Sequence, residues 1–196
     1  ADLWLDRAED PDCFLLREAN GGELTLSGQF EGGIAFHVSA RVVHCNGTVV
    51  ARGPELRVEG ATEVVVFIDV GTSATGGAPA REREQRELGK CTFNIWSELI
   101  ACHLATYRPR FRAAELSLDV PEPDLPTDEQ VAALRRGNPD PGLIALYFAY
   151  GRYLLIAATL RADLPPNLQG KWNEDIDPPW SSDYHHDINL QMNLWP

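Results

Sequence analysis

The sequence predicts a mixed fold in which an antiparallel β-region comes first and an α-helical region follows. As far as residue 70, the sequence contains short apolar runs and two stretches, 34–42 and 55–59, in which apolar residues alternate with polar or small ones, the period of half-buried strands. Beyond residue 80 the apolar residues recur at steps of three and four, which is the period of an amphipathic helix. Residues 71–79 are mostly small and include three glycines, so we expect the change of structure within this stretch.

Glycine-containing turns divide the β-region into short segments. The clearest alternation covers residues 34–42, and Asn46-Gly47 is a turn signal shortly after it. Strands that recur every ~8–12 residues between such turns are typical of an antiparallel β-sandwich. The expected strands lie within residues 3–5, 13–16, 24–26, 34–42, 48–50, 55–59 and 64–70.

The helical region opens with charges and continues with aromatic residues. An alternating charge run at residues 80–88 predicts a solvated helix. Trp96, His103 and Tyr107 then mark one face of a further helix, which we expect Pro109 to end. On this face His103 is expected to be a core histidine rather than a ligand.

Two more helices are predicted towards the end of the chain. Thr127 is expected to cap a short helix that carries Asp128 in its first turn and ends near Gly137. Pro141 then opens the strongest helical pattern, which is apolar over most of its circumference. A helix of that kind is normally buried.

Composition excludes several classes of function. The chain has 17 basic and 29 acidic residues, and a net charge of −12 argues against general nucleic-acid binding. No stretch approaches ~18 consecutive apolar residues, so no membrane span is expected. The four cysteines contain no C-x-x-C pair, so we expect small, mostly buried side chains rather than a zinc site: Cys13, Cys45, Cys91 and Cys102.

Residues 165–196 combine three of the five tryptophans with several amides and five carboxylates. Tryptophan faces cover the apolar C–H face of a pyranose, while amides and carboxylates bind its hydroxyls. The segment therefore predicts a sugar pocket in which Trp172, Trp180 and Asn173 bind substrate. The alternative from composition alone is a polar, tightly hydrogen-bonded domain junction.

Three motifs in this segment closely resemble glycoside hydrolase family 95: LPPNLQGKWN at residues 164–173, PPWSSDYH at 178–185 and DINLQMNLWP at 187–196. The resemblance implies part of an N-terminal β-sandwich over residues 1–76 and a helical linker over residues 77–126. Residues 127–196 would then be the first helices of an (α/α)6 barrel. The chain would be a piece of a longer enzyme, and we expect it to be inactive alone.

The family consists of inverting α-L-fucosidases and some α-L-galactosidases, so the implied substrate is a fucosylated glycan. Two asparagines separated by one residue position the attacking water there, and a histidine two residues earlier helps to hold the sugar. Carried onto this sequence, the histidine is His185 and the second asparagine is Asn189. Asp187 stands where the family has the first asparagine, and it brings a charge that an amide lacks. The general acid and base would follow residue 196.

Two readings compete with the fucosidase. One is a non-catalytic carbohydrate-binding protein derived from the same fold, in which Asp187 reflects lost catalysis. The other is a metal-dependent enzyme that uses Asp183, His185, His186 and Asp187. Adjacent histidines rarely ligate one ion, because neighbouring side chains diverge. We therefore expect no metal and no cofactor, and we favour an extracellular or periplasmic location although these residues contain no signal peptide.

The local conformation around Asp187 has two predicted forms. If residues 184–189 are extended, Asp187 and Asn189 lie on one side and share a water or a sugar hydroxyl. If Asp187 instead caps a following helix, its carboxylate binds backbone N–H groups and contributes ~1 kcal/mol there. We favour the extended form.

Overall fold

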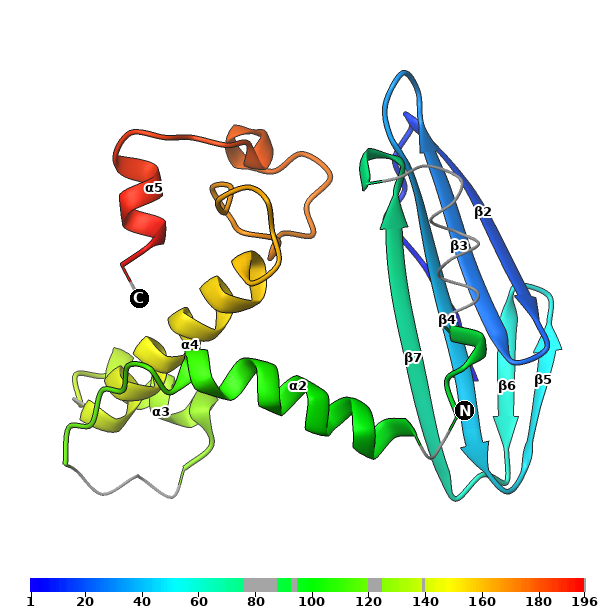
Figure 1. Cartoon of the computed structure of the whole chain (residues 1–196), viewed down its shortest axis with the longest axis horizontal. Coiled ribbons are helices and arrows are strands. Elements are labelled where there is room, and N and C mark those ends of the chain that lie inside the picture. Colours follow the sequence, from blue (N-terminus) through cyan, green and yellow to red (C-terminus); the bar gives the residue numbers. More distant parts are fainter. Residues whose placement is uncertain (76–87, 93–94, 120–124, 139, 196) are drawn as a thin grey trace. The chain divides into compact units, whose positions relative to one another are not determined.

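The structure is a computed structural model of the chain, and it describes residues 1–75, 88–92, 95–119, 125–138 and 140–195. The chain divides into two compact units, Ala1–Ala101 and Cys102–Pro196. Strands make up most of the first unit, and helices and loops make up the second (Figure 1). The predicted order of β-structure followed by α-structure is confirmed. The three-part domain division stays a prediction.

Seven strands form two antiparallel sheets in the first unit. One sheet has the order β1-β6-β5 and the other has the order β2-β3-β4-β7. All seven segments expected from the sequence contribute to a strand. The strands are β1 (Asp2–Leu3), β2 (Cys13–Asn20), β3 (Glu23–Phe30), β4 (Ala35–Cys45), β5 (Thr48–Arg52), β6 (Glu55–Glu59) and β7 (Glu63–Thr72), and a short 3-10 helix, η1 (Ser73–Thr75), follows.

The two sheets pack on a shared apolar core. Leu24 of β3 and Ala40 and Val42 of β4 lie against Leu56 and Val58 of β6, and all five are buried. These residues occupy alternate positions of their strands, which is why the period-two pattern identified the strands. The core therefore joins one sheet to the other, as a sandwich requires.

The chain crosses from one sheet to the other at Asn46 and Gly47, between β4 and β5. Both residues have left-handed backbones, with φ of 59° and 72°. A Cβ on Gly47 would lie 2.3 Å from the carbonyl oxygen of Glu59 and 2.5 Å from the amide nitrogen of Ala61. Glycine at residue 47 is thus required both by the backbone angle and by the close approach of the chain after β6.

An ion pair fastens the first strand to the smaller sheet. Arg57 of β6 donates from Nε and Nη2 to the two carboxylate oxygens of Asp2, at 2.6 and 2.8 Å. This hydrogen bonding lowers the pKa of Asp2 below its ordinary value.

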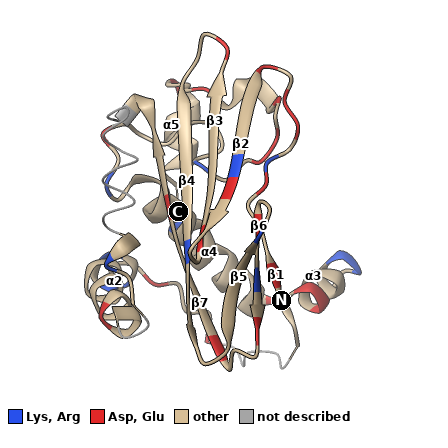
Figure 2. Cartoon of the chain, turned by 90° about the vertical axis from the view of Figure 1, so that its right-hand side faces the viewer, with Lys and Arg blue, Asp and Glu red and all other residues tan. Residues whose placement is uncertain are grey.

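Elsewhere, basic and acidic positions are scattered over the described strands and helices, and in the view of Figure 2 the basic ones do not gather on one face.

Because the pKa of Asp2 is lower in the folded protein, the pair stabilises the fold at neutral pH. We expect this contribution to be lost as pH falls through about 4, where the unfolded carboxyl takes up its proton, and on through the lower folded pKa. The pair is solvent-exposed, so the effect is small. The measurement is urea denaturation at pH 7 and pH 3 of the wild type and of Asp2→Asn. The difference in stability between the two proteins should be smaller at pH 3 than at pH 7, and an equal difference at both values would contradict the assignment.

Helices and loops make up the second unit, and helix α2 begins in the first unit. The elements are α2 (Ile95–Phe111), α3 (Thr127–Arg135), α4 (Pro141–Thr159), a short 3-10 helix η2 (Pro179–Ser182) and α5 (Ile188–Asn193). Most of the predicted charged helix at residues 80–88 lies outside the described residues. The prediction that Pro109 ends its helix is wrong, since α2 continues to Phe111. A proline close to a helix end removes one backbone hydrogen bond without forcing the helix to stop at once.

The ends of α3 and α4 differ in how they are capped. Thr127 is the first residue of α3 rather than its cap, and Pro126 at the cap position makes no side-chain hydrogen bond, so the predicted capping role is wrong. At the other end Gly137 has φ of +89°, and the amides of Gly137 and Asn138 bond to the carbonyls of Leu134 and Ala133. This is the glycine-terminated helix end that the sequence predicts. Before α4, the carboxylate of Asp140 accepts the amide N–H of Leu143.

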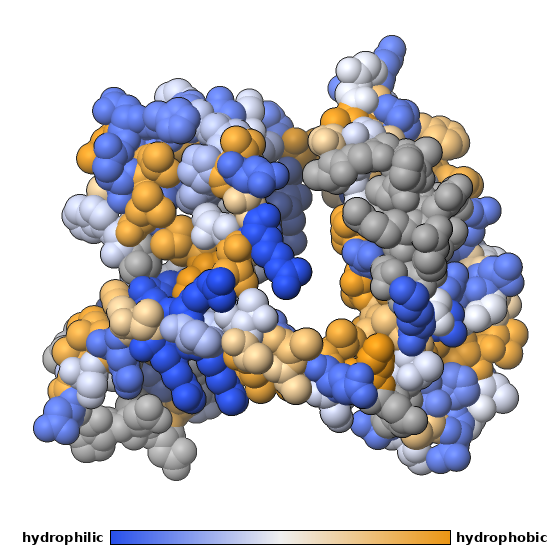
Figure 3. Space-filling view, in the orientation of Figure 1, coloured by the Kyte–Doolittle hydropathy of each residue, from blue (hydrophilic) through white to orange (hydrophobic). Residues whose placement is uncertain are grey.

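The composition of α4 predicts burial against the other helices of a complete barrel, and within this chain most of the helix surface is exposed or half-buried. Only Leu143 and Ala158 of this helix are buried, while Tyr147 is 77% exposed. Figure 3 shows hydrophobic side chains at the surface over α4.

His103 was expected to be a core histidine and Cys102 to be buried, but both side chains are exposed on α2, so these expectations are wrong. The other three cysteines are half-buried. An apolar pattern states which face prefers burial, but burial itself needs a neighbour in the same chain.

By length and composition, α4 could also cross a membrane. This finding qualifies the expectation that no segment is apolar enough to do so. A single helix of this kind is weak evidence for a membrane span, because the core helices of soluble domains pass the same test.

Candidate sugar-binding site

Hydrogen bonds tie together the three motif stretches of the polar C-terminal segment. The amide of Leu168 donates to the carbonyl of Asp183 at 3.1 Å, and the side chain of Asn193 donates to the carbonyl of Asn167 at 3.1 Å. Each bond joins residues at least 15 positions apart, so the stretches form one local structure. The segment is therefore a hydrogen-bonded scaffold, whichever ligand it binds.

Trp172 is docked onto α4. Its indole N–H donates to the carbonyl of Leu154 at 3.3 Å, and its ring centroid lies 6.0 Å from that of Tyr153. Gly170, at φ +64°, makes room for it, since a Cβ there would lie 3.1 Å from the indole ring. Trp172 is nevertheless 47% exposed, so part of the ring remains available to a ligand.

The ring of Tyr153 links Trp172 to α2. It packs edge-on against Tyr107 at 6.2 Å, and Tyr107 stacks between His103 and Phe111 at 5.5 and 5.3 Å. Burial, reinforced by the neighbouring Tyr153, raises the pKa of the Tyr107 hydroxyl. Sequence reasoning did not assign Tyr153 any role, because its partners lie on other elements and leave no mark in the local pattern.

The rings of Trp180 and His185 lie against each other. Their rings meet edge to face, with centroids 6.3 Å apart, and Trp180 is 78% exposed. The backbone that presents Trp180 is unusual, because Trp180, Ser181 and Ser182 all have positive φ, at 56°, 53° and 48°. Runs of non-glycine residues in this region are uncommon and cluster at functional sites.

A carboxylate that sequence reasoning had not assigned to the sugar site completes this group. Nε2 of His185 lies 2.8 Å from Oδ1 of Asp183, and both side chains are partly exposed. Sequence reasoning counted Asp183 among the five carboxylates of the segment and in the metal alternative, but gave it no individual role in the sugar site. The signal that could have found it is the two-residue spacing, which puts both side chains on one side of an extended segment.

Asp187 lies at the start of α5, with φ of 56° and ψ of −145°. This combination is almost restricted to glycine, so the aspartate holds a strained backbone. The carboxylate makes no capping hydrogen bond, which contradicts the capping alternative. The extended form predicted for residues 184–189 is also wrong at its end, because Ile188 and Asn189 are already helical.

The predicted residues come together only in part. Asp187 is exposed and Asn189 is half-buried, and no hydrogen bond joins them in the described structure. The side chain of Asn173 is bonded locally, to Asp175 at 3.3 Å, rather than to His185. The described pairing is thus Trp180 with His185 and Asp183, while Trp172 is held on α4.

The part of the chain that the structure describes contains no group of three His, Cys, Asp or Glu side chains able to hold a metal ion. Asp183 and His185 pair, but His186 and Asp187 do not join them as further ligands. Among the described residues, the geometry therefore provides no set of three ligands for the metal-dependent alternative.

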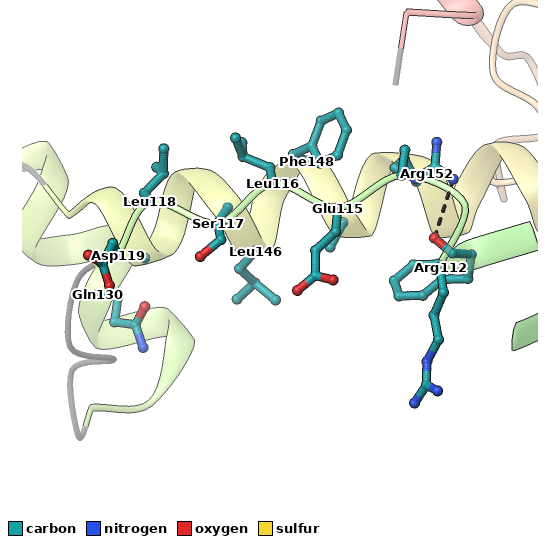
Figure 4. Close-up of a pocket in the computed structure, with 15 residues that line it drawn as sticks. Arg112, Glu115, Leu116, Ser117, Leu118, Asp119, Gln130, Leu146, Phe148 and Arg152 are labelled. Carbon is teal, nitrogen blue, oxygen red and sulfur yellow. Dashed lines mark hydrogen bonds between the residues drawn. The ribbon is translucent and has the colours of Figure 1, made fainter.

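A pocket of about 650 Å³ lies elsewhere in the second unit. Residues 111–119 run alongside α4 and form it together with Gln130 and one side of α4 (Figure 4). Arg152 closes one end by donating from Nη2 to the carbonyls of Arg110 and Phe111, at 3.0 and 3.3 Å. None of the residues predicted to bind sugar lines this pocket, so it is separate from the candidate site.

The sequence of this chain is similar to one family of known proteins over its C-terminal half. Residues 95–196 match the model of the glycosyl hydrolase family 95 catalytic domain. "Probable alpha-fucosidase A" of Aspergillus niger is 42% identical over 104 residues, which are 51% of this chain and 13% of that protein. "Alpha-L-fucosidase 2" of Arabidopsis thaliana is 41% identical over 106 residues, covering 51% and 12%. The chain thus spans about one-eighth of the length of these relatives.

The family match covers just over half of the chain and includes every residue of the candidate site. The second unit therefore lies within the stretch that matches the family 95 catalytic domain. The chain belongs to glycosyl hydrolase family 95, as its three motifs indicated.

Proposed function

We propose that this chain is part of an enzyme that hydrolyses terminal α-L-fucosyl residues of glycans with inversion of configuration. The observation that carries the proposal is the family match over residues 95–196, which contains the motif with His185, Asp187 and Asn189. The names of two relatives, "Probable alpha-fucosidase A" and "Alpha-L-fucosidase 2", support a fucoside as substrate. An α-L-galactosyl residue is the second candidate substrate, because family 95 also includes some α-L-galactosidases.

An inverting hydrolase needs an acid at the leaving oxygen and a base-activated water on the opposite face of the sugar. We assign Asn189 and Asp187 to the positioning of that water. The amide of Asn189 both donates and accepts hydrogen bonds, whereas an ionised Asp187 only accepts them. The strained backbone that presents Asp187 supports this role, since no capping bond of its side chain accounts for it.

We assign the binding of the sugar to His185, Trp180, Trp172 and Asn173. Trp180 offers an exposed indole face beside the imidazole of His185, a combination that suits a pyranose with one apolar face and several hydroxyls. Trp172 and Asn173 would contribute from the neighbouring loop.

The test is turnover of nitrophenyl α-L-fucoside by the full-length protein, with nitrophenyl α-L-galactoside as the matched substrate. We expect hydrolysis of the fucoside that rises linearly with enzyme concentration. Faster hydrolysis of the galactoside would change the assigned sugar. Binding of L-fucose in calorimetry without turnover of either substrate would overturn the proposal in favour of a carbohydrate-binding protein.

A further inference from the structure

Helix α5 carries Asn189 but is too short to hold itself in place. It has six residues, and no side chain caps its N-terminal end. A helix of this length forms few backbone hydrogen bonds against the cost of its first turn, so contacts with the rest of the protein must stabilise it. Apolar packing supplies little of this within the described residues, because Ile188 is 59% exposed and Met192 is 47% exposed.

One side chain fastens the far end of α5. Nδ2 of Asn193 donates to the backbone carbonyl of Asn167 at 3.1 Å, and the two residues are 26 positions apart. A backbone carbonyl only accepts hydrogen bonds, so the atom of Asn193 that faces it is the amide nitrogen. The bond is partly buried, which strengthens it relative to a bond in water.

The acceptor of this bond belongs to a turn that has hydrogen bonds of its own. The carbonyl of Asn167 also accepts the amide N–H of Gly170 at 3.2 Å. The side-chain oxygen of Asn167 accepts the amide N–H of Gln169 at 3.1 Å. Because these bonds do not involve α5, Asn193 ties the helix to a frame that is fixed independently of it.

Asn189 lies on the same face of α5 as Asn193. The two residues are four positions apart, which places their side chains one above the other along a helix. Both are half-buried, whereas Ile188 and Gln191 are exposed. The face of α5 that is tied to the Asn167 turn is therefore also the face that carries the Asn189 amide.

The residue before α5 needs the same support. Asp187 has φ of 56° and ψ of −145°, and its side chain makes no capping bond. A backbone in this region persists only where the surrounding contacts over-determine it. The Asn193 bond fixes the helix that follows directly and so restricts the backbone of Asp187 as well.

We propose that Asn193 is a positioning residue whose hydrogen bond to the Asn167 carbonyl fixes α5 and thereby holds the Asn189 amide where it orients the attacking water. The role of Asn189 rests on the proposed function, while the anchoring of α5 does not. Asn193 acts through Asn189 rather than on the sugar or the water.

The anchoring of α5 is tested first, without reference to activity. Amide hydrogen exchange of the full-length protein is followed by mass spectrometry over peptides that cover residues 188–195. We expect Asn193→Ala to raise the exchange rate of these amides about tenfold or more, because the helix then opens locally more often. Gln191→Ala, which removes an exposed amide from the same helix, is the matched control and should exchange as the wild type. Equal protection in the wild type and Asn193→Ala would overturn the inference and leave the proposed function standing.

The second arm measures kinetics of the full-length protein on nitrophenyl α-L-fucoside. For Asn193→Ala we expect kcat to fall about tenfold and KM to change less than about twofold, because misplacing the attacking water weakens the transition state more than substrate binding. In an Asn189→Ala background, the same substitution should lower kcat by less than about twofold, since the group that Asn193 positions is already gone. Gln191→Ala should leave kcat near its wild-type value.

The double substitution separates positioning from a merely structural role. Equal losses of kcat in the two backgrounds would show that Asn193 does not act through Asn189 and would overturn the positioning claim. Unchanged kcat in Asn193→Ala together with faster exchange would also overturn it. Absence of turnover in the wild type would reject the proposed function, and hydrogen exchange would still decide whether Asn193 anchors α5.

A second variant, Asn193→Asp, retains the size of the side chain and removes the donor. An ionised carboxylate cannot donate to the Asn167 carbonyl, so this variant should lose at least as much kcat as alanine. Wild-type kcat in Asn193→Asp would overturn the inference. Because the Asn167 turn keeps its own hydrogen bonds, both variants should fold, which a thermal melt checks.

Discussion

Replacing Asn189 with alanine is expected to lower kcat of the full-length protein on an α-L-fucoside by about a hundred- to a thousandfold. The expectation follows from the proposed role of its amide, which would hold the attacking water in line with the bond that breaks. Alanine retains the helical preference of residue 189 within α5, so the fold should be preserved. KM should change much less than kcat, because water positioning matters mainly in the transition state.

The matched control is Asn138→Ala, which removes an exposed amide just beyond α3. It should leave both kcat and the melting temperature near their wild-type values. If Asn189→Ala retained more than about a tenth of the wild-type kcat, a loss of only ~1.4 kcal/mol, Asn189 would have no catalytic role.

Two substitutions at Asp187 separate its chemistry from its backbone strain. Asp187→Asn retains the side-chain shape and removes the charge, and we expect about a tenfold change in rate or in its pH dependence. Asp187→Gly suits φ of 56° and ψ of −145°, so it should stabilise the local fold by about 1 kcal/mol while activity falls. Unchanged kinetics in both variants would end the catalytic proposal for this residue.

The largest expected effect on stability comes from Gly47→Ala. A new Cβ would lie 2.3 Å from the carbonyl oxygen of Glu59 and 2.5 Å from the amide nitrogen of Ala61, and neither backbone atom can move alone. The left-handed φ of 72° adds about 1–2 kcal/mol, and overpacking adds about 1–3 kcal/mol. We therefore expect a loss of about 3 kcal/mol or more.

Gly53→Ala provides the control for this prediction. Gly53 has φ of +61°, similar to Gly47, but a Cβ there would meet no atom within 4 Å. Its replacement should cost only the backbone part, about 1–2 kcal/mol. Urea denaturation of the chain, followed by far-ultraviolet circular dichroism, measures both. Equal losses for the two variants would show that the close approach of residues 59–61 to the turn is not maintained.

The strands could be predicted from the sequence because their evidence is local. Alternation through Val38, Ala40 and Val42 records which side of β4 faces the core, and Asn46-Gly47 marks the crossing. Burial of α4 could not be predicted in the same way. The apolar circumference of α4 indicates a preference for burial, but Tyr147 is 77% exposed among the residues that the structure describes.

The site was predicted by resemblance and only in part by pattern. Around Asp187 the period was ambiguous, because a six-residue helix and an extended strand give similar apolar spacing over so short a stretch. The pairing of His185 with Asp183 and the bond from Trp172 to Leu154 had to come from the structure. Such contacts depend on backbone turns, such as the left-handed run at Trp180, that no periodicity encodes.

The most direct test of the central claim follows hydrolysis of an α-L-fucoside by the full-length protein with time-resolved proton NMR. An inverting fucosidase releases β-L-fucose first, and the α-anomer appears later by mutarotation. We expect this order, together with its loss in Asn189→Ala. Release of α-L-fucose as the first product, or binding of the fucoside without any hydrolysis, would contradict the account.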